Sequence, residues 1–122
     1  MDPNIAQGAL IGGGLICGAS LTVVGLAGTW QVDCAALTAM GLGFYMLHAS
    51  IQVYVTEFAP AARSSAVAFH TFSFFVGGGI SPVLYGGGLD RLGPGMTLSI
   101  AAVAMVLIGI VSAQLLVKPR PT

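Results

Sequence analysis

The spacing of the charged residues constrains this chain more than any other feature. Only eight of its 122 residues are charged, and they leave four long uncharged runs, at 3–32, 34–56, 64–89 and 92–117. Each run exceeds the roughly 20 residues with which an apolar helix crosses a bilayer. Open strands leave backbone groups unsatisfied in lipid, and four strands are too few to close a barrel, so the runs predict helices.

The composition agrees with this pattern. Apolar residues make up 56% of the chain and charged residues 7%, whereas soluble domains carry about 25% charged residues. The sequence therefore predicts an all-α integral membrane protein, a single membrane domain with four transmembrane helices near 5–28, 34–56, 65–88 and 96–117. The formal net charge is zero, so the lipid bilayer is the expected surroundings and nucleic acid is not an expected partner. No cofactor is predicted.

The stretch from Glu57 to Ser65 is the predicted turn between the second and third helices. Pro60 is expected to end the second helix because its ring has no N–H to donate and clashes with the preceding turn. Ser64 or Ser65 is expected to accept hydrogen bonds from the free amides that open the third helix. Glu57 and Arg63 are placed where water begins, because an unpaired charge is costly in hydrocarbon.

Small residues in the first predicted helix indicate close packing. Glycines recur in pairs four residues apart, at Gly8, Gly12, Gly14 and Gly18. Such spacing lets helix backbones approach closely. Cys17 and Cys34 lie in or beside apolar segments at no metal-like spacing, so each is expected to be a small buried hydrophobe.

Polar stripes on the two middle helices mark the candidate cavity. Tyr45, His48 and Gln52 share one face of the second helix, and His48 lies about 13 Å from Glu57 at the rise of an α-helix. Polar side chains at that depth normally face a bundle interior or a wet cavity. The third helix carries a similar stripe, and the candidate cavity residues are Tyr45, His48, Gln52, His70 and Ser73.

Basic residues indicate the orientation. Four spans place both termini and the Glu57–Arg63 turn on one side, which holds Arg63, Lys118 and Arg120, while the other side holds Arg91. Basic residues favour the cytoplasmic side. The sequence thus predicts a multi-pass protein of the inner (plasma) membrane with both termini in the cytoplasm.

The central motif resembles a known family. Residues 57–68, Glu-Phe-Ala-Pro-Ala-Ala-Arg-Ser-Ser-Ala-Val-Ala, are similar to the turn between helices ten and eleven of the major facilitator superfamily. The family's usual pattern there is Glu, two residues, Pro, then Arg and a small residue that opens the next helix. Residues 41–48 and 77–82 strengthen the resemblance, and so do Gly86, Asp90 and Gly93. The serines at 64 and 65 depart from the more usual glycine or arginine.

This resemblance covers essentially the whole chain, but only as the last four of twelve helices in the family's bacterial efflux-type, proton-coupled branch. It implies a secondary active transporter of small organic solutes. The chain is then expected to be a carboxy-terminal fragment, inactive alone. By position, the second helix would line the cavity, the third would lie between the two halves, and the first and fourth would face lipid.

Each site residue admits two interpretations. His48 is either a proton carrier, since imidazole titrates near neutrality, or a neutral hydrogen-bonding group in a packed bundle, and the same holds for His70. Tyr45 and Gln52 are either substrate contacts or packed polar groups. Glu57 and Arg63 are either a gating charge cluster or solvated charges at helix ends.

Two other function classes fit the sequence less well. A small four-helix multidrug transporter that acts as a dimer is the alternative, but that class carries a membrane-embedded glutamate in its first helix, and residues 5–28 contain no acid. An enzyme is not predicted, because neither paired carboxylates nor a Ser-His-Asp set nor a His-rich metal cluster is visible. The expected partners are a small-molecule solute and either the missing helices of a full-length transporter or a second copy.

Overall fold

The computed structural model describes residues 2–117, and over that range the chain is all-helical. Helix α1 spans Pro3–Leu26, α2 spans Trp30–Phe58, the 3-10 turn η1 spans Pro60–Ala62, and α3 spans Arg63–Leu116. The three α-helices are each long and apolar enough to cross a membrane. The predicted all-α fold and the apolar character of its long helices are therefore confirmed for the described residues.

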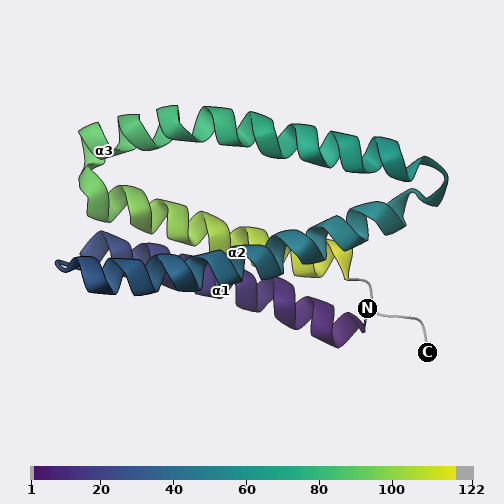
Figure 1. The fold of residues 1–122 in the computed structure, drawn as a ribbon, viewed down its shortest axis with the longest axis horizontal. Helices are drawn as coiled ribbons and strands as arrows, with labels where there is room; N and C mark the ends of the chain where they lie inside the picture. The colour runs from purple at the N-terminus through teal and green to yellow at the C-terminus, as the bar shows by residue number, and fades with distance from the viewer. Residues whose placement is uncertain (1, 118–122) are drawn as a thin grey trace.

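Helix α3 is two helical arms that meet at Gly93. Its 54 residues would extend about 80 Å as a straight helix. Gly93 instead adopts φ 81° and ψ 167°, a conformation open essentially to glycine alone, and Pro94 disfavours helical geometry in the residue before it. Figure 1 shows the chain doubling back at this point. We call residues 63–92 the first arm and residues 94–116 the second arm.

The helices extend beyond several of their predicted ends. The sequence predicts a non-helical connection between residues 88 and 96. In the structure Gly93 is the residue with non-helical backbone angles there, because the segment around Asp90 remains helical. The predicted cap at Ser64 or Ser65 is wrong. The residue before the helix is Ala62, and no side chain caps the first amides. The 3-10 turn leads directly into α3, so both serines already lie inside its first turn.

Helix α1 is the centre of the packed part of the molecule and lies against α2 and the second arm (Figure 1). Its backbone touches both neighbours. A Cβ added at Gly13 would lie 2.7 Å from the carbonyl oxygen of Gly43, and one added at Gly14 would lie 3.0 Å from the Cα of Gly109. Such close approach requires glycine on both sides.

Two of the four glycines predicted to allow close packing lie at a backbone contact between helices. Gly14 and Gly18 lie at backbone contacts with the second arm, whereas a Cβ at Gly8 would meet no described atom within 4 Å and one at Gly12 would make an ordinary contact with Met46. The resemblance implied that the first helix faces lipid. The structure instead makes α1 the helix with the most buried residues, because small residues on two of its faces allow two neighbours to approach.

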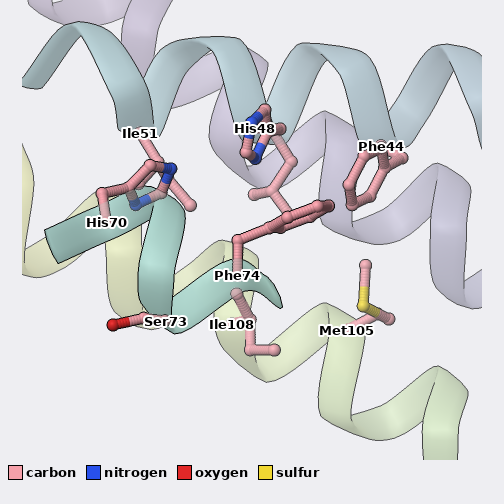
Figure 2. Close-up of a pocket in the computed structure, with 9 residues that line it drawn as sticks. Phe44, His48, Ile51, His70, Ser73, Phe74, Met105 and Ile108 are labelled. Atoms are coloured by element: carbon pink, nitrogen blue, oxygen red, sulfur yellow. The ribbon is translucent and has the colours of Figure 1, made fainter. Parts of the chain in front are cut away.

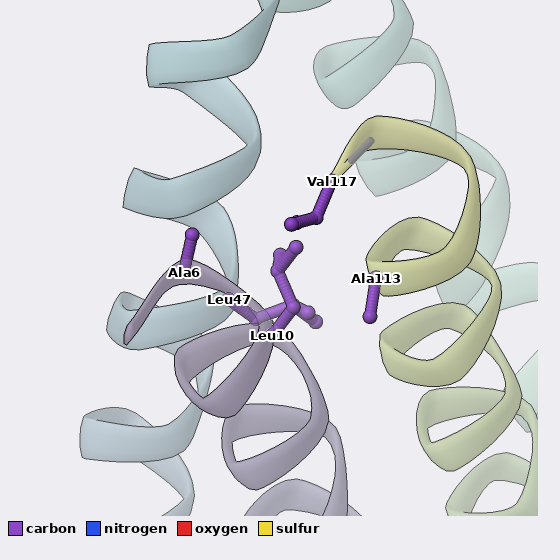
Figure 3. Packing of buried hydrophobic residues seen from close by; sticks show 5 residues of the cluster. All are labelled: Ala6, Leu10, Leu47, Ala113 and Val117. Atoms are coloured by element: carbon purple, nitrogen blue, oxygen red, sulfur yellow. The ribbon is translucent and has the colours of Figure 1, made fainter. Parts of the chain in front are cut away.

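The buried core joins all three helices at one end of the bundle. Its members come from α1, α2, the second arm and the residue that follows this arm (Figure 3): Ala6, Leu10, Leu47, Ala113 and Val117. Cys17 is also fully buried, and its thiol donates a hydrogen bond of 3.5 Å to the carbonyl of Met40. Cys34 is exposed, so the prediction of a buried cysteine is confirmed at position 17 and wrong at position 34.

The first arm has a different environment. Within this described stretch, no residue from Arg63 to Met96 is buried. Phe69 and Phe75 are 73% and 70% exposed, and a Cβ added at any of Gly77, Gly78 or Gly79 would meet no described atom within 4 Å. The first arm therefore lies beside the bundle and is not packed into it.

Candidate functional site

The two histidines of the chain meet where α2 faces the first arm. The ring centroids of His48 and His70 lie 5.2 Å apart, with 32° between the ring planes (Figure 2). Ala59 and the three residues of η1 connect α2 to α3, and the two helices then run back alongside each other. His48 lies ten residues before the end of α2 and His70 seven residues after the start of α3, which is roughly 15 Å and 10 Å along their helices. The hairpin thus brings both imidazoles to a similar depth.

Two phenylalanines enclose His48. Its ring stacks on Phe44, with centroids 5.5 Å apart and an interplanar angle of 12°, and lies 5.0 Å from Phe74. Aromatic pairs at such distances contribute about 0.5–1.5 kcal/mol beyond the area they bury. Neither phenylalanine is among the site residues predicted from the sequence. The available signal was the spacing, because each phenylalanine lies four residues from a histidine on its own helix, and hence on the same face.

A cavity of about 310 Å³ lies against this aromatic cluster. Its volume is at the lower end of the range for small-molecule sites, about 300–1,000 Å³. It is lined by residues of α2 and both arms of α3: Phe44, Leu47, His48, Ile51, His70, Ser73, Phe74, Met105 and Ile108. The lining is apolar except for two imidazoles and one hydroxyl, and it contains no charged side chain among the described residues.

The polar groups of the cavity differ in what they contact. The hydroxyl of Ser73 donates a hydrogen bond of 2.9 Å to the carbonyl of Phe69, one turn earlier on the same helix. The Nε2 atom of His70 is enclosed and has no hydrogen-bond partner among residues 2–117. Buried polar atoms without a partner are uncommon in native proteins. The imidazole of His70 therefore brings to this site an enclosed nitrogen whose hydrogen-bonding capacity is unused.

A second cavity continues from the first toward the turn. It has a volume of about 380 Å³, and its lining includes Val55, Phe58 and Phe69. His70 and Ser73 border both cavities. The open space therefore follows the contact between α2 and the first arm, from the aromatic cluster to the η1 end of the hairpin.

The structure separates two of the predicted residues from this site. Tyr45 is 71% exposed, Gln52 is also exposed, and neither lines the cavity. The face of α2 that lines it carries Phe44, His48 and Ile51. Packing of the adjacent Gly43 against α1 sets the rotation of α2, and the polar stripe alone did not determine it.

The predicted charge pair lies at the turn. Glu57 and Arg63 are both exposed, one at the end of α2 and the other at the start of α3. Lys118 and Arg120, which entered the predicted orientation, lie outside the described residues. Across residues 2–117, no group of three or more His, Cys, Asp or Glu side chains gathers into a metal site.

Comparisons with protein-family models, with curated proteins and with solved structures found no match.

Proposed function

We propose that this chain is a four-span membrane protein that forms one wall of the solute path of a secondary transporter. In this proposal α1, α2 and the two arms of α3 each cross the bilayer. The resemblance to the last four helices of the major facilitator superfamily supports it, and so does the length of the apolar helices. The membrane is the inner (plasma) membrane, and both termini lie on its cytoplasmic side, as the distribution of basic residues favours.

The observation that carries the proposal is the unburied first arm. Phe69, Phe72 and Phe75 are each at least 66% exposed. A Cβ added at Gly77, Gly78 or Gly79 would meet no described atom within 4 Å, although α1 is closely packed on two sides. Transporters of this type place the solute site between two helical halves that move against each other. The first arm carries part of a cavity on one face and leaves its other faces exposed. In the proposal, the second half of the transporter docks on these exposed faces.

The lining of the cavity supports the proposal that the transported molecule is a small organic solute. Its uncharged, mostly aromatic and aliphatic lining favours an apolar molecule with an aromatic ring, because such rings stack on phenylalanine and imidazole. His48 and His70 are the side chains in the described lining of this cavity that can take up a proton, and we assign proton coupling to them. Efflux is the direction that the family resemblance favours.

The chain by itself is proposed to be inactive. A transport path needs a site that opens alternately to either side, and this requires two bundles. Here the described lining of the cavity comes from a single bundle, from α2 and the two arms of α3. Its partner is then the remaining helices of a full-length transporter or, in the alternative, a second copy of the chain.

Two experiments test this function. The coding DNA upstream of Met1 should continue in frame into eight more apolar helices. The purified chain, reconstituted in liposomes, should give no substrate-dependent proton flux above that of empty vesicles. Saturable flux by the 122-residue chain that is abolished by His48→Ala would overturn the one-wall proposal and favour the small dimeric transporter.

A further inference from the structure

We propose that His48 and His70 together form a binding site for a divalent transition-metal cation such as Zn²⁺, Ni²⁺ or Cu²⁺. Two imidazoles from different helical elements face each other across 5.2 Å between ring centroids (Figure 2). One of them has an enclosed nitrogen without a partner among the described residues. Both rings border a cavity that can hold further ligands.

The distance between the rings fits two imidazoles on one ion. Metal–nitrogen bonds to histidine are about 2.0–2.1 Å long, so with the ring centre about 1.2 Å behind the nitrogen the ion lies about 3.2 Å from each centroid. A tetrahedral angle at the ion then separates the two centroids by about 5.2 Å. The observed separation of 5.2 Å matches this value.

The chemistry of the lining selects the class of ion. Imidazole nitrogen suits zinc, copper and nickel, whereas magnesium and calcium prefer carboxylate and carbonyl oxygens. No carboxylate or thiol belongs to the described lining of this cavity, and the nearest soft group in it is the thioether of Met105. The buried Cys17 is engaged elsewhere, by the carbonyl of Met40.

The remaining coordination positions are open. A tetrahedral ion with two protein ligands needs two further ligands. In zinc sites with open coordination positions, water or substrate fills those positions. The cavity of about 310 Å³ has room for water molecules or for a chelating group of a solute. With two protein ligands the site binds more weakly than a closed structural site with four.

Metal binding would tie the first arm to the bundle. His48 belongs to α2 and His70 to the first arm, and the two elements also meet in the aromatic contacts of Phe74 with Phe44 and His48. An ion that binds both imidazoles adds a link between two elements that otherwise pack loosely, and it favours the arrangement in which the rings face each other.

Electron paramagnetic resonance of bound Cu²⁺ tests the site in the full chain, purified in micelles without a polyhistidine tag. The chain contains two histidines, so a 1:1 complex with two imidazole nitrogens on one copper ion requires both. We expect such a spectrum in the wild type. His48→Phe and His70→Phe, which keep an aromatic ring in the cluster, should each remove one nitrogen and weaken Cu²⁺ binding about tenfold or more.

The matched control is Tyr45→Phe, which changes an exposed residue outside the cavity and should leave both the spectrum and the affinity unchanged. Excess Mg²⁺ or Ca²⁺ should not displace the copper, whereas Zn²⁺ should. A wild-type spectrum with one imidazole nitrogen or none would overturn the proposal, whatever the folding of the variants. So would tight Cu²⁺ binding that survives in His70→Phe.

Discussion

The substitution Gly109→Ala tests the close approach of α1 and the second arm. A Cβ at this position would lie 2.7 Å from the carbonyl oxygen of Leu10 and 3.1 Å from the Cα of Gly14. Both are backbone atoms, which cannot rotate away as a flexible side chain can. The two helices would have to separate by several tenths of an ångström, up to about 1 Å, to restore ordinary contacts of about 3.5–4.0 Å.

The expected magnitude combines two opposing effects. Overpacking a well-packed interface costs about 1–3 kcal/mol, whereas replacing glycine by alanine inside a helix stabilises it by up to about 1 kcal/mol. We therefore expect Gly109→Ala to lower the free energy of unfolding by up to about 2 kcal/mol. The nearby core residues Leu10 and Ala113 should lose part of their contact in the process.

The assay compares this variant with a matched control. Gly8→Ala makes the same chemical change in α1, where the added Cβ would meet no described atom within 4 Å. Unfolding of both variants in mixed micelles, followed by circular dichroism as the denaturing detergent increases, gives the two free energies. Because the propensity effect cancels, their difference should be about 1–3 kcal/mol, the cost of overpacking. A Gly109→Ala variant at least as stable as Gly8→Ala would refute the backbone contact.

Three further predictions concern the bend, the orientation and the cavity. Gly93→Ala should destabilise the chain by about 1–3 kcal/mol, because alanine would have to adopt a backbone conformation that is open essentially to glycine, although an added Cβ would meet no described atom within 4 Å. Unfolding in micelles measures this loss, and an unchanged stability would contradict the bend at Gly93. Reporter fusions after Arg63 and Arg91 should report cytoplasm and periplasm, respectively, and a periplasmic signal after Arg63 would reverse the orientation. In a cysteine-free form of the proposed full-length transporter, Ser73→Cys should react with water-soluble thiol reagents. Leu107→Cys, on an exposed apolar face of the second arm, should not, and protection at both positions would mean that the cavity is closed.

The candidate site was only partly predictable from the sequence. His48, His70 and Ser73 stood out because polar side chains are rare in these apolar helices, and the structure places all three on one cavity. Tyr45 and Gln52 were grouped with them by helical periodicity, yet the cavity face of α2 is turned away from both. Periodicity identifies residues that share a face, but it does not determine which neighbour that face meets.

The sequence by itself determined the helical character of the chain and the positions of its breaks. Long uncharged runs can satisfy their backbone groups in an apolar setting only as helices. Pro60 and the Gly93–Pro94 pair mark the two reversals of direction around the first arm, because proline and positive-φ glycine act locally on the backbone.

Only the tertiary structure decided which helix became the centre and which side chains meet. Almost every face of these helices is apolar, so hydrophobicity cannot rank the possible contacts, and steric fit at the glycines selects among them. Gly13 and Gly14 let α2 and the second arm approach α1 to backbone contact, which sets the rotation of α2. That rotation, together with the short η1 turn, brings His48 and His70 to 5.2 Å.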